Sequence, residues 1–195
     1  CELSRGLGDV YKRQMIMMAE PLMGATERAL DFVGRSSDVE IIYPSPQGKL
    51  WNQDSAKKFS QTDKMIFICG HYKGIDQRVI DKYVTNQFSV GDYVLTNGEL
   101  PSMMMLDSAL RLGPGVLNNI ESALSDTFSL GLLDYPHYTQ PRIIDDKEVP
   151  EVLVSGHHEK IESWRQSHRE SRTRDKRPDL WEKYKKIRKS EKDYE

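Results

Sequence analysis

The chain has 195 residues, with 28 Lys and Arg, 30 Asp and Glu, and a formal net charge of −2. This length fits one large domain or two small ones. The sequence contains no run of 18 apolar residues and no recognisable signal peptide, which excludes a transmembrane helix. Two cysteines, Cys1 and Cys69, are too few for a disulfide framework or a cysteine-rich zinc site. We therefore expect a cytoplasmic protein without membrane contact.

The charges are unevenly distributed along the chain. Residues 160–195 contain 13 Lys and Arg against 8 Asp and Glu, whereas the rest contains 15 against 22. A basic end on an acidic body indicates a polyanionic partner for that end. The alternative is a solvated helix whose charges pair at i,i+4 spacing.

Residues 1–14 show no clear hydrophobic period, and we interpret them as a non-native leader. After them, helical and strand patterns alternate, with Pro21 in the first turn of the first helix and Gly34 after its end. The predicted elements are helix 20–33, strand 39–43, loop 44–48, a weak helix 54–60, strand 64–69, helix 75–84, strand 93–95 and helix 99–112. This alternation predicts an α/β domain with a mostly parallel sheet over residues 15–115.

The loops that follow the three predicted strands are rich in Gly, Pro, Ser and Asn. They cover residues 43–48, 70–74 and 96–101. Because ligands bind at the carboxyl ends of the strands in open α/β sheets, we expect these loops to form one site.

The remainder of the chain has a different character. Residues 116–134 lack a period and are predicted to be a linker. Residues 135–195 contain several prolines and then two helical patterns, 156–172 and 178–189, which predict a small all-α domain.

Common catalytic and phosphate-binding motifs are absent from the sequence. There is no G-x-G-x-x-G, P-loop, H-E-x-x-H or G-x-S-x-G pattern. His157 and His158 precede Glu159, but adjacent side chains diverge around a helix and rarely ligate one ion together. We therefore assign no metal site.

Six ordered motifs are more informative. They are YPSPQG at 43–48, CGHYKGIDQR at 69–78, SVGDYVLTNGELP at 89–101, SDTF at 125–128, GLLDYPHYTQP at 131–141, and SGHHEKI followed by WR at 155–165. Between Met15 and Pro178 the chain resembles the TrmD family of bacterial tRNA (guanine-N1)-methyltransferases, in the SPOUT superfamily. His71 and Lys73 stand where that family frequently has arginine and glutamate, and Asn97 replaces a glycine.

The resemblance implies a homodimer in which the three loops form a deep trefoil knot and bind S-adenosylmethionine. It also implies that the N-terminal part of the knotted domain is missing, and that catalysis requires magnesium, for which no site is assigned. The implied cofactor-binding residues, called the cofactor set below, are Tyr43, Pro44, Ser45, Gly70, Tyr72, Val90, Gly91, Asp92, Tyr93, Val94, Leu95, Asn97, Gly98 and Pro101. Ordinary core packing is the alternative for the apolar members.

Methyl transfer to N1 of guanine requires a base for the N1 proton and a donor that stabilises negative charge on O6. Asp126 matches the general base of the family, and Arg111 matches its arginine at the guanine. From the sequence alone, Asp126 could instead cap a turn, and Arg111 could complement a helix dipole. The resemblance further implies that the two subunits share each active site.

The substrate implied by the resemblance is guanosine 37 of tRNA, on the 3′ side of the anticodon, and no DNA partner is expected. Phosphate-binding residues of the helical domain would be Arg165, Arg169, Arg172, Arg174, Lys176 and Arg177. Two alternatives remain. One is a catalytically inactive, knotted RNA-binding dimer, and the other is a SPOUT methyltransferase acting on rRNA or on ribose.

Overall fold

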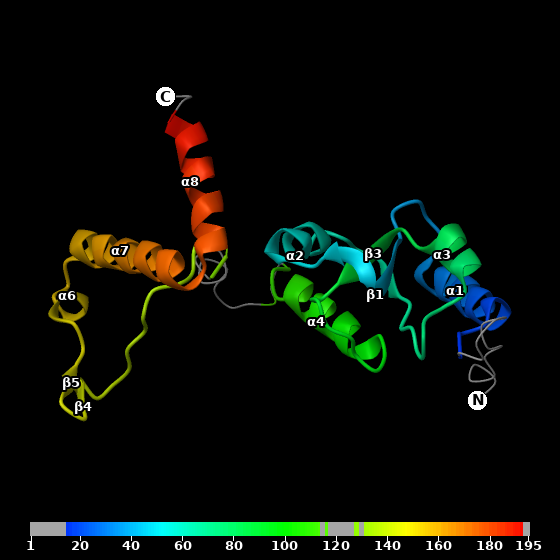
Figure 1. Ribbon diagram of the computed structural model, residues 1–195, viewed down its shortest axis with the longest axis horizontal. Helices are drawn as coiled ribbons and strands as arrows, with labels where there is room; N and C mark the ends of the chain where they lie inside the picture. The colour runs from blue at the N-terminus through cyan, green and yellow to red at the C-terminus, as the bar shows by residue number, and fades with distance from the viewer. Residues whose placement is uncertain (1–14, 114–115, 117–126, 129–130, 193–195) are drawn as a thin grey trace. The chain divides into compact units, whose positions relative to one another are not determined.

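The computed structural model describes residues 15–113, 116, 127–128 and 131–192, which form two compact units (Figure 1). The N-terminal unit is Cys1–Asn118 and the C-terminal unit is Asn119–Glu195. No helix in these described ranges is long and apolar enough to cross a bilayer.

The N-terminal unit is built on a parallel three-stranded sheet in the order β2-β1-β3. The strands are β1 (Glu40–Leu50), β2 (Met65–Phe67) and β3 (Asn86–Ser89). Near the start of β1, Ile42 lies opposite Phe67 on one side and Asn86 on the other. The predicted α/β class with a parallel sheet is confirmed.

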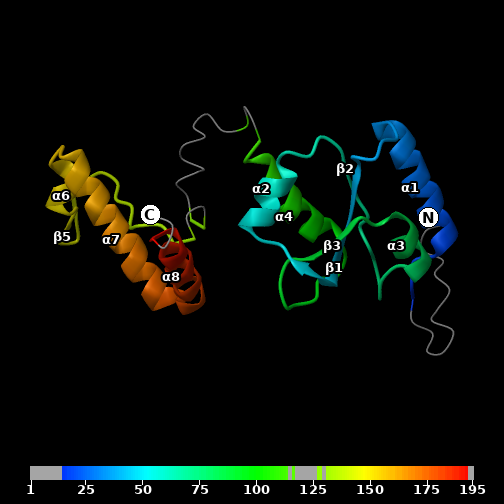
Figure 2. The same cartoon turned by 90° about the horizontal axis from the view of Figure 1, so that it is seen from above.

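Helices cover both faces of this sheet. Figure 2 shows α1 (Ala19–Val33) and α3 (Gln77–Tyr83) on one side, with α2 (Gln53–Phe59) and α4 (Glu99–Leu110) on the other. Successive side chains of β1 alternate between these layers. Ile41 packs in the core with α1 and α3, whereas Ile42 is fully buried in the core with α2 and α4.

The connections between strands leave the sheet on opposite faces. The segment from β1 to β2 passes through α2, and the segment from β2 to β3 passes through α3. The loops after β1 and β2 therefore diverge at the carboxyl edge of the sheet. Such a divergence opens a crevice that open α/β sheets commonly use for ligands.

The predicted loop at 44–48 does not end β1, so that prediction is wrong. Pro44 and Lys49 both lie opposite Phe88, and the residues between them leave the strand as an excursion before pairing resumes. Prolines are tolerated here because an excursion needs no ladder hydrogen bonds. Gly48 is required where the excursion returns, since a Cβ there would lie 2.4 Å from the backbone nitrogen of Phe88.

The third strand was predicted at 93–95, and this is also wrong. Pairing with β1 is made by Asn86–Ser89, whereas Val94 is 85% exposed in the following loop. The polar residue that begins β3 is stabilised by a hydrogen bond, because the side-chain amide of Asn86 donates to the Glu40 carboxylate at 2.6 Å. Helices α1, α2, α3 and α4 lie within a few residues of their predicted positions.

The C-terminal unit is mostly helical. It contains α6 (Glu151–Val154), α7 (His158–Lys176) and α8 (Pro178–Lys192), and α7 packs against both of the others. It is not all-α as predicted, because β4 (Ile143–Ile144) and β5 (Lys147–Glu148) form an antiparallel hairpin. The break before α8 reflects Pro178, whose missing N–H is tolerated only in a first helical turn.

Residues near the end of the predicted linker are attached to α7. Leu132 is buried, and the backbone N–H of Leu133 donates to the Thr173 hydroxyl at 2.8 Å. The same hydroxyl donates to the carbonyl of Arg169 at 2.6 Å, and Thr173 is fully buried. This side chain therefore connects the incoming chain to the helix.

Thr173→Val is expected to destabilise the C-terminal unit by about 1–3 kcal/mol, because valine keeps the volume but leaves the Leu133 N–H unsatisfied. Hydrogen exchange of the α7 amides measures this free energy. Thr173→Ser, which keeps the hydroxyl, serves as the control. If the α7 amides of the valine variant were as protected from exchange as those of the wild type, the hydrogen bond from Leu133 to Thr173 would contribute nothing to stability.

Candidate ligand site at the carboxyl edge of the sheet

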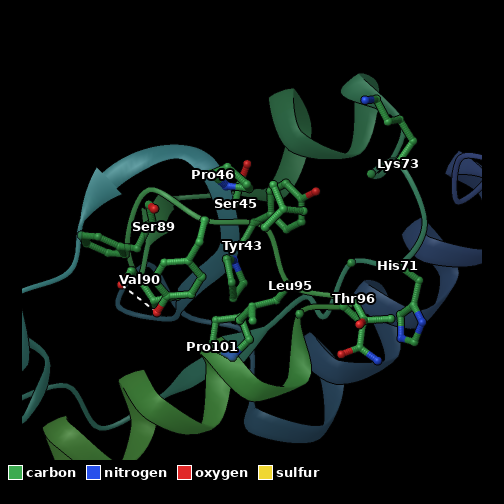
Figure 3. A pocket seen from close by; sticks show the side chains of 18 of the residues that line it. Tyr43, Ser45, Pro46, His71, Lys73, Ser89, Val90, Leu95, Thr96 and Pro101 are labelled. Atoms are coloured by element: carbon green, nitrogen blue, oxygen red, sulfur yellow. Dashed lines mark hydrogen bonds between the residues drawn. The ribbon is translucent and has the colours of Figure 1, made fainter.

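A cavity lies at the carboxyl edge of the sheet of the N-terminal unit (Figure 3). It is lined by three segments: the middle of β1 where its excursion begins, the loop after β2, and the segment from the end of β3 to α4. These segments correspond to the three predicted loops, and Pro101 in the first turn of α4 completes the wall. The divergent connections around β1 therefore create the predicted crevice.

Every member of the cofactor set lines this cavity except Asp92, which is exposed in the third loop. The lining also contains residues outside that set: Pro46, His71, Lys73, Gly74, Phe88, Ser89 and Thr96. Ser89 could have been found from the S-V-G sequence at 89–91, because a serine side chain commonly forms a hydrogen bond with the backbone two residues further on. Ser89 Oγ accepts from the Gly91 N–H at 3.2 Å and donates to the Gly91 carbonyl at 2.9 Å.

The second and third loops are joined through their backbones. The N–H of Gly98 donates to the carbonyl of Gly70 at 2.8 Å, and His71 pairs with Asn97 in a short antiparallel bridge. A Cβ at position 98 would lie 2.7 Å from the Gly70 nitrogen, so only glycine permits this approach. The Ser102 hydroxyl donates to the Gly98 carbonyl at 2.7 Å and fixes the junction to α4.

A side-chain contact reinforces the same junction. His71 Nε2 lies 2.6 Å from Glu99 Oε1, which links the second loop to the first turn of α4. The other carboxylate oxygen, Oε2, is buried and has no hydrogen-bond partner among the described residues. The pair therefore holds the two loops together at one wall of the cavity.

Glu99→Ala is expected to raise amide exchange in residues 70–74 and at Gly98 by about fivefold, since a lost hydrogen bond costs on the order of 1 kcal/mol. Glu20→Ala is the matched control, because Glu20 also lies in the first turn of a helix but is exposed on α1. Unchanged exchange in the Glu99 variant would mean that the backbone contacts alone hold the loops.

The chemistry of the cavity is dominated by backbone groups, hydroxyls and apolar side chains. Burial raises the pKa of the Tyr43 phenol, so this ring presents a neutral hydroxyl. Among the described residues, no group of three His, Cys, Asp or Glu side chains could hold a metal ion. The site is therefore suited to a small organic ligand recognised through its shape and through backbone hydrogen bonds.

Of the two predicted catalytic residues, Arg111 is described, and it does not line this cavity. Arg111 is the C-cap of α4, whereas Pro101 at the other end of the helix lines the cavity. Ten residues of α-helix separate them by about 15 Å along the axis. Asp126 lies outside the described residues.

The predicted phosphate-binding residues differ in their surroundings. Arg169 is only 7% exposed, and its guanidinium contacts Asp134 at 3.5 Å and Glu162 at 3.3 Å. Arg177 forms a double contact with Asp179 at 2.8 and 2.6 Å, which lowers the pKa of that aspartate to about 2. The others range from half-buried to exposed: Arg165 and Arg172 are half-buried, and Arg174 and Lys176 are exposed.

The sequence model of the family described as tRNA (Guanine-1)-methyltransferase TrmD matches residues 11–183. The chain belongs to the TrmD family. The match begins inside the segment that we interpreted as a leader. It extends through α7 into α8, so TrmD similarity spans both units.

Individual relatives agree with this assignment. A tRNA (guanine-N(1)-)-methyltransferase of Lachnospira eligens is 47% identical over 170 residues, which cover 87% of this chain and 71% of the relative. A protein of the same name from Moorella thermoacetica is 49% identical over 166 residues, covering 85% of this chain and 66% of the relative. A protein of the same name from Clostridioides difficile is 46% identical over 169 residues, covering 87% of this chain and 73% of the relative.

Proposed function

We propose that the protein transfers the methyl group of S-adenosylmethionine to N1 of guanosine 37 in tRNA. The observation that carries this proposal is the convergence of three TrmD-type loop motifs on one cavity at the carboxyl edge of the sheet. Relatives nearly half identical to this chain bear the name tRNA (guanine-N(1)-)-methyltransferase. The TrmD assignment also supports a SPOUT fold, and we propose that the three loops form its trefoil knot.

The lining residues fit S-adenosylmethionine. Val90, Leu95 and Pro101 offer apolar surface to an adenine ring, and the glycine-rich junction at Gly70 and Gly98 exposes backbone groups for polar atoms. The bound cofactor supplies an electrophilic methyl group on a sulfonium. The chain would hold the donor and exclude water, while the guanine approaches from the open side.

The deprotonation is assigned to Asp126. N1 of guanine carries a proton at neutral pH, so it becomes nucleophilic only as a base removes that proton. As the proton leaves, negative charge grows on O6, and an arginine at that oxygen stabilises it. We propose Asp126 and Arg111 for these two roles. Magnesium dependence stays a prediction without an assigned site.

A homodimer with shared active sites would account for the position of Arg111. Arg111 is remote from the cavity of its own chain, so a second copy would have to bring it there. The exposed face of α4 offers a contact surface for that copy: Leu100, Met103, Met104 and Leu110 are 49–65% exposed along one side of the helix. Exposed apolar side chains gathered on one side of a helix are typical of an interaction surface, and here the exposed Asp107 lies among them.

The decisive experiment measures methyl incorporation. Methyl-labelled S-adenosylmethionine and tRNA transcripts with guanosine or adenosine at position 37 are incubated with the protein, and the product is mapped. We expect label only in the guanosine transcript, at N1. Binding of tRNA without transfer would favour the inactive RNA-binding dimer, and label in rRNA or on ribose would favour another SPOUT activity.

The affinity for tRNA is expected to fall steeply with salt, because Lys and Arg contacts to phosphates release counterions. Arg174→Gln and Lys176→Gln should each reduce the slope of log affinity against log salt by about 0.7–0.9 if each contacts one phosphate. Arg28→Gln, at an exposed position of α1, is the control and should leave the slope unchanged. Equal slopes for all variants would remove this part of α7 from the RNA interface.

A further inference from the structure

A second cavity, of about 450 Å³, lies in the C-terminal unit, where none of the cofactor set is found. It is lined by residues between Tyr135 and Arg142, by Val149 after β5, and by side chains of α6 and α7. Tyr138 lies on one side, aliphatic side chains that include Leu153 and Ile161 form apolar surface, and Arg142 and Arg165 add positive charge. The volume lies within the range of small-ligand pockets.

The aromatic residues around this cavity are not equivalent. Two guanidinium groups, those of Arg165 and Arg169, lie 4.9 Å from the ring centroid of Tyr135, so that ring is already engaged. Tyr138 is 48% exposed, and its ring is tilted against that of Trp164 with 6.4 Å between the ring centroids. Tyr138 therefore offers an open aromatic face beside the cavity.

The arginines at this cavity are only weakly engaged by acids. Arg142 pairs with Glu148 at 2.7 Å, but both side chains are more than half exposed, and such pairs contribute little. Arg165 meets Glu162 at a long 3.4 Å. Either guanidinium could exchange its partner for a phosphate without leaving a buried charge unpaired.

We infer that this cavity binds one unpaired nucleobase of the RNA, stacked on Tyr138, with a neighbouring phosphate at Arg142 or Arg165. An aromatic face beside cationic groups is the combination that binds single-stranded nucleic acid. A peptide could use the aliphatic surface, but the excess of Lys and Arg over residues 160–195 favours a polyanion. The inference rests on the proposed tRNA substrate and adds a base contact to phosphate contacts, which carry no sequence information.

The test compares Tyr138→Ala with wild type in tRNA binding, using labelled transcripts at several salt concentrations. Loss of one stacked base should weaken binding by about 5- to 150-fold. The salt slope should stay unchanged, because stacking releases no counterions. Tyr138→Phe keeps the ring and should bind like wild type. Tyr138→Leu keeps much of the volume without the aromatic face and should bind like the alanine variant.

A scan with abasic nucleotides then locates the base. At one unpaired position of the transcript, removing the base should weaken tRNA binding by the wild type by the same factor. The same removal should not further weaken binding by Tyr138→Ala. The inference would be overturned by a scan in which no position affects binding, or by alanine and leucine variants that bind tRNA like wild type. Either result is what we would expect if the cavity bound a protein partner instead. Failure of the proposed function is a separate result, because it would appear as absent methyl transfer by the wild type.

Discussion

Asp126→Ala is expected to lower the single-turnover rate of methyl transfer by about 10²–10⁴-fold, the contribution of a positioned acid–base group. Binding of S-adenosylmethionine should be nearly unchanged, because the cavity is built from other residues. Without the carboxylate, transfer would depend on guanine that has already lost its N1 proton. The residual rate of the variant should therefore rise with pH.

Single-turnover kinetics across pH, together with cofactor affinity, measure both parts of this expectation. Ser125→Ala is the neighbouring control, since it changes the same S-D-T-F motif without removing a base. If the alanine variant at position 126 reacted as fast as wild type, Asp126 would have no part in deprotonation. A loss of cofactor binding in that variant would instead indicate a structural role.

Most of the N-terminal unit could be predicted because its elements carry strong local signals. Helix α1 has an apolar face that ends at Gly34, and the first half of β1 is a buried run of apolar residues. The cavity lining could be predicted for a different reason. The second and third motifs follow β2 and β3, whose loops share one edge of the sheet, and the first motif interrupts the pairing of β1 at that edge.

The errors occurred where tertiary contacts override local preference. Tyr93, Val94 and Leu95 have high strand propensity, yet they lie in a loop, while the more polar Asn86–Ser89 pairs with β1. Similarly, sequence cannot distinguish a phosphate-binding arginine from a buried one. Arg169 reads as part of a basic helix, but its partners Asp134 and Tyr135 lie more than thirty residues away in the chain.

Subunit complementation should restore activity from two inactive chains. Asp126→Ala removes the proposed base, and Gly98→Val places a side chain against the backbone of Cys69 and Gly70, which should close the cavity. If the base acts on the cavity of the other subunit, each mixed dimer regains one intact site. Random exchange at equal amounts then restores about a quarter of the wild-type sites.

The measurement is methyl transfer after chain exchange, with mixed dimers confirmed by two different affinity tags. A mixture of two Asp126→Ala chains is the control and should stay inactive. If base and cavity belonged to one chain, every chain in the mixture would lack one of them, and no activity would return. Recovery of methyl transfer therefore distinguishes a shared site from a site within one subunit. This test does not depend on the distance between Arg111 and the cavity of its own chain.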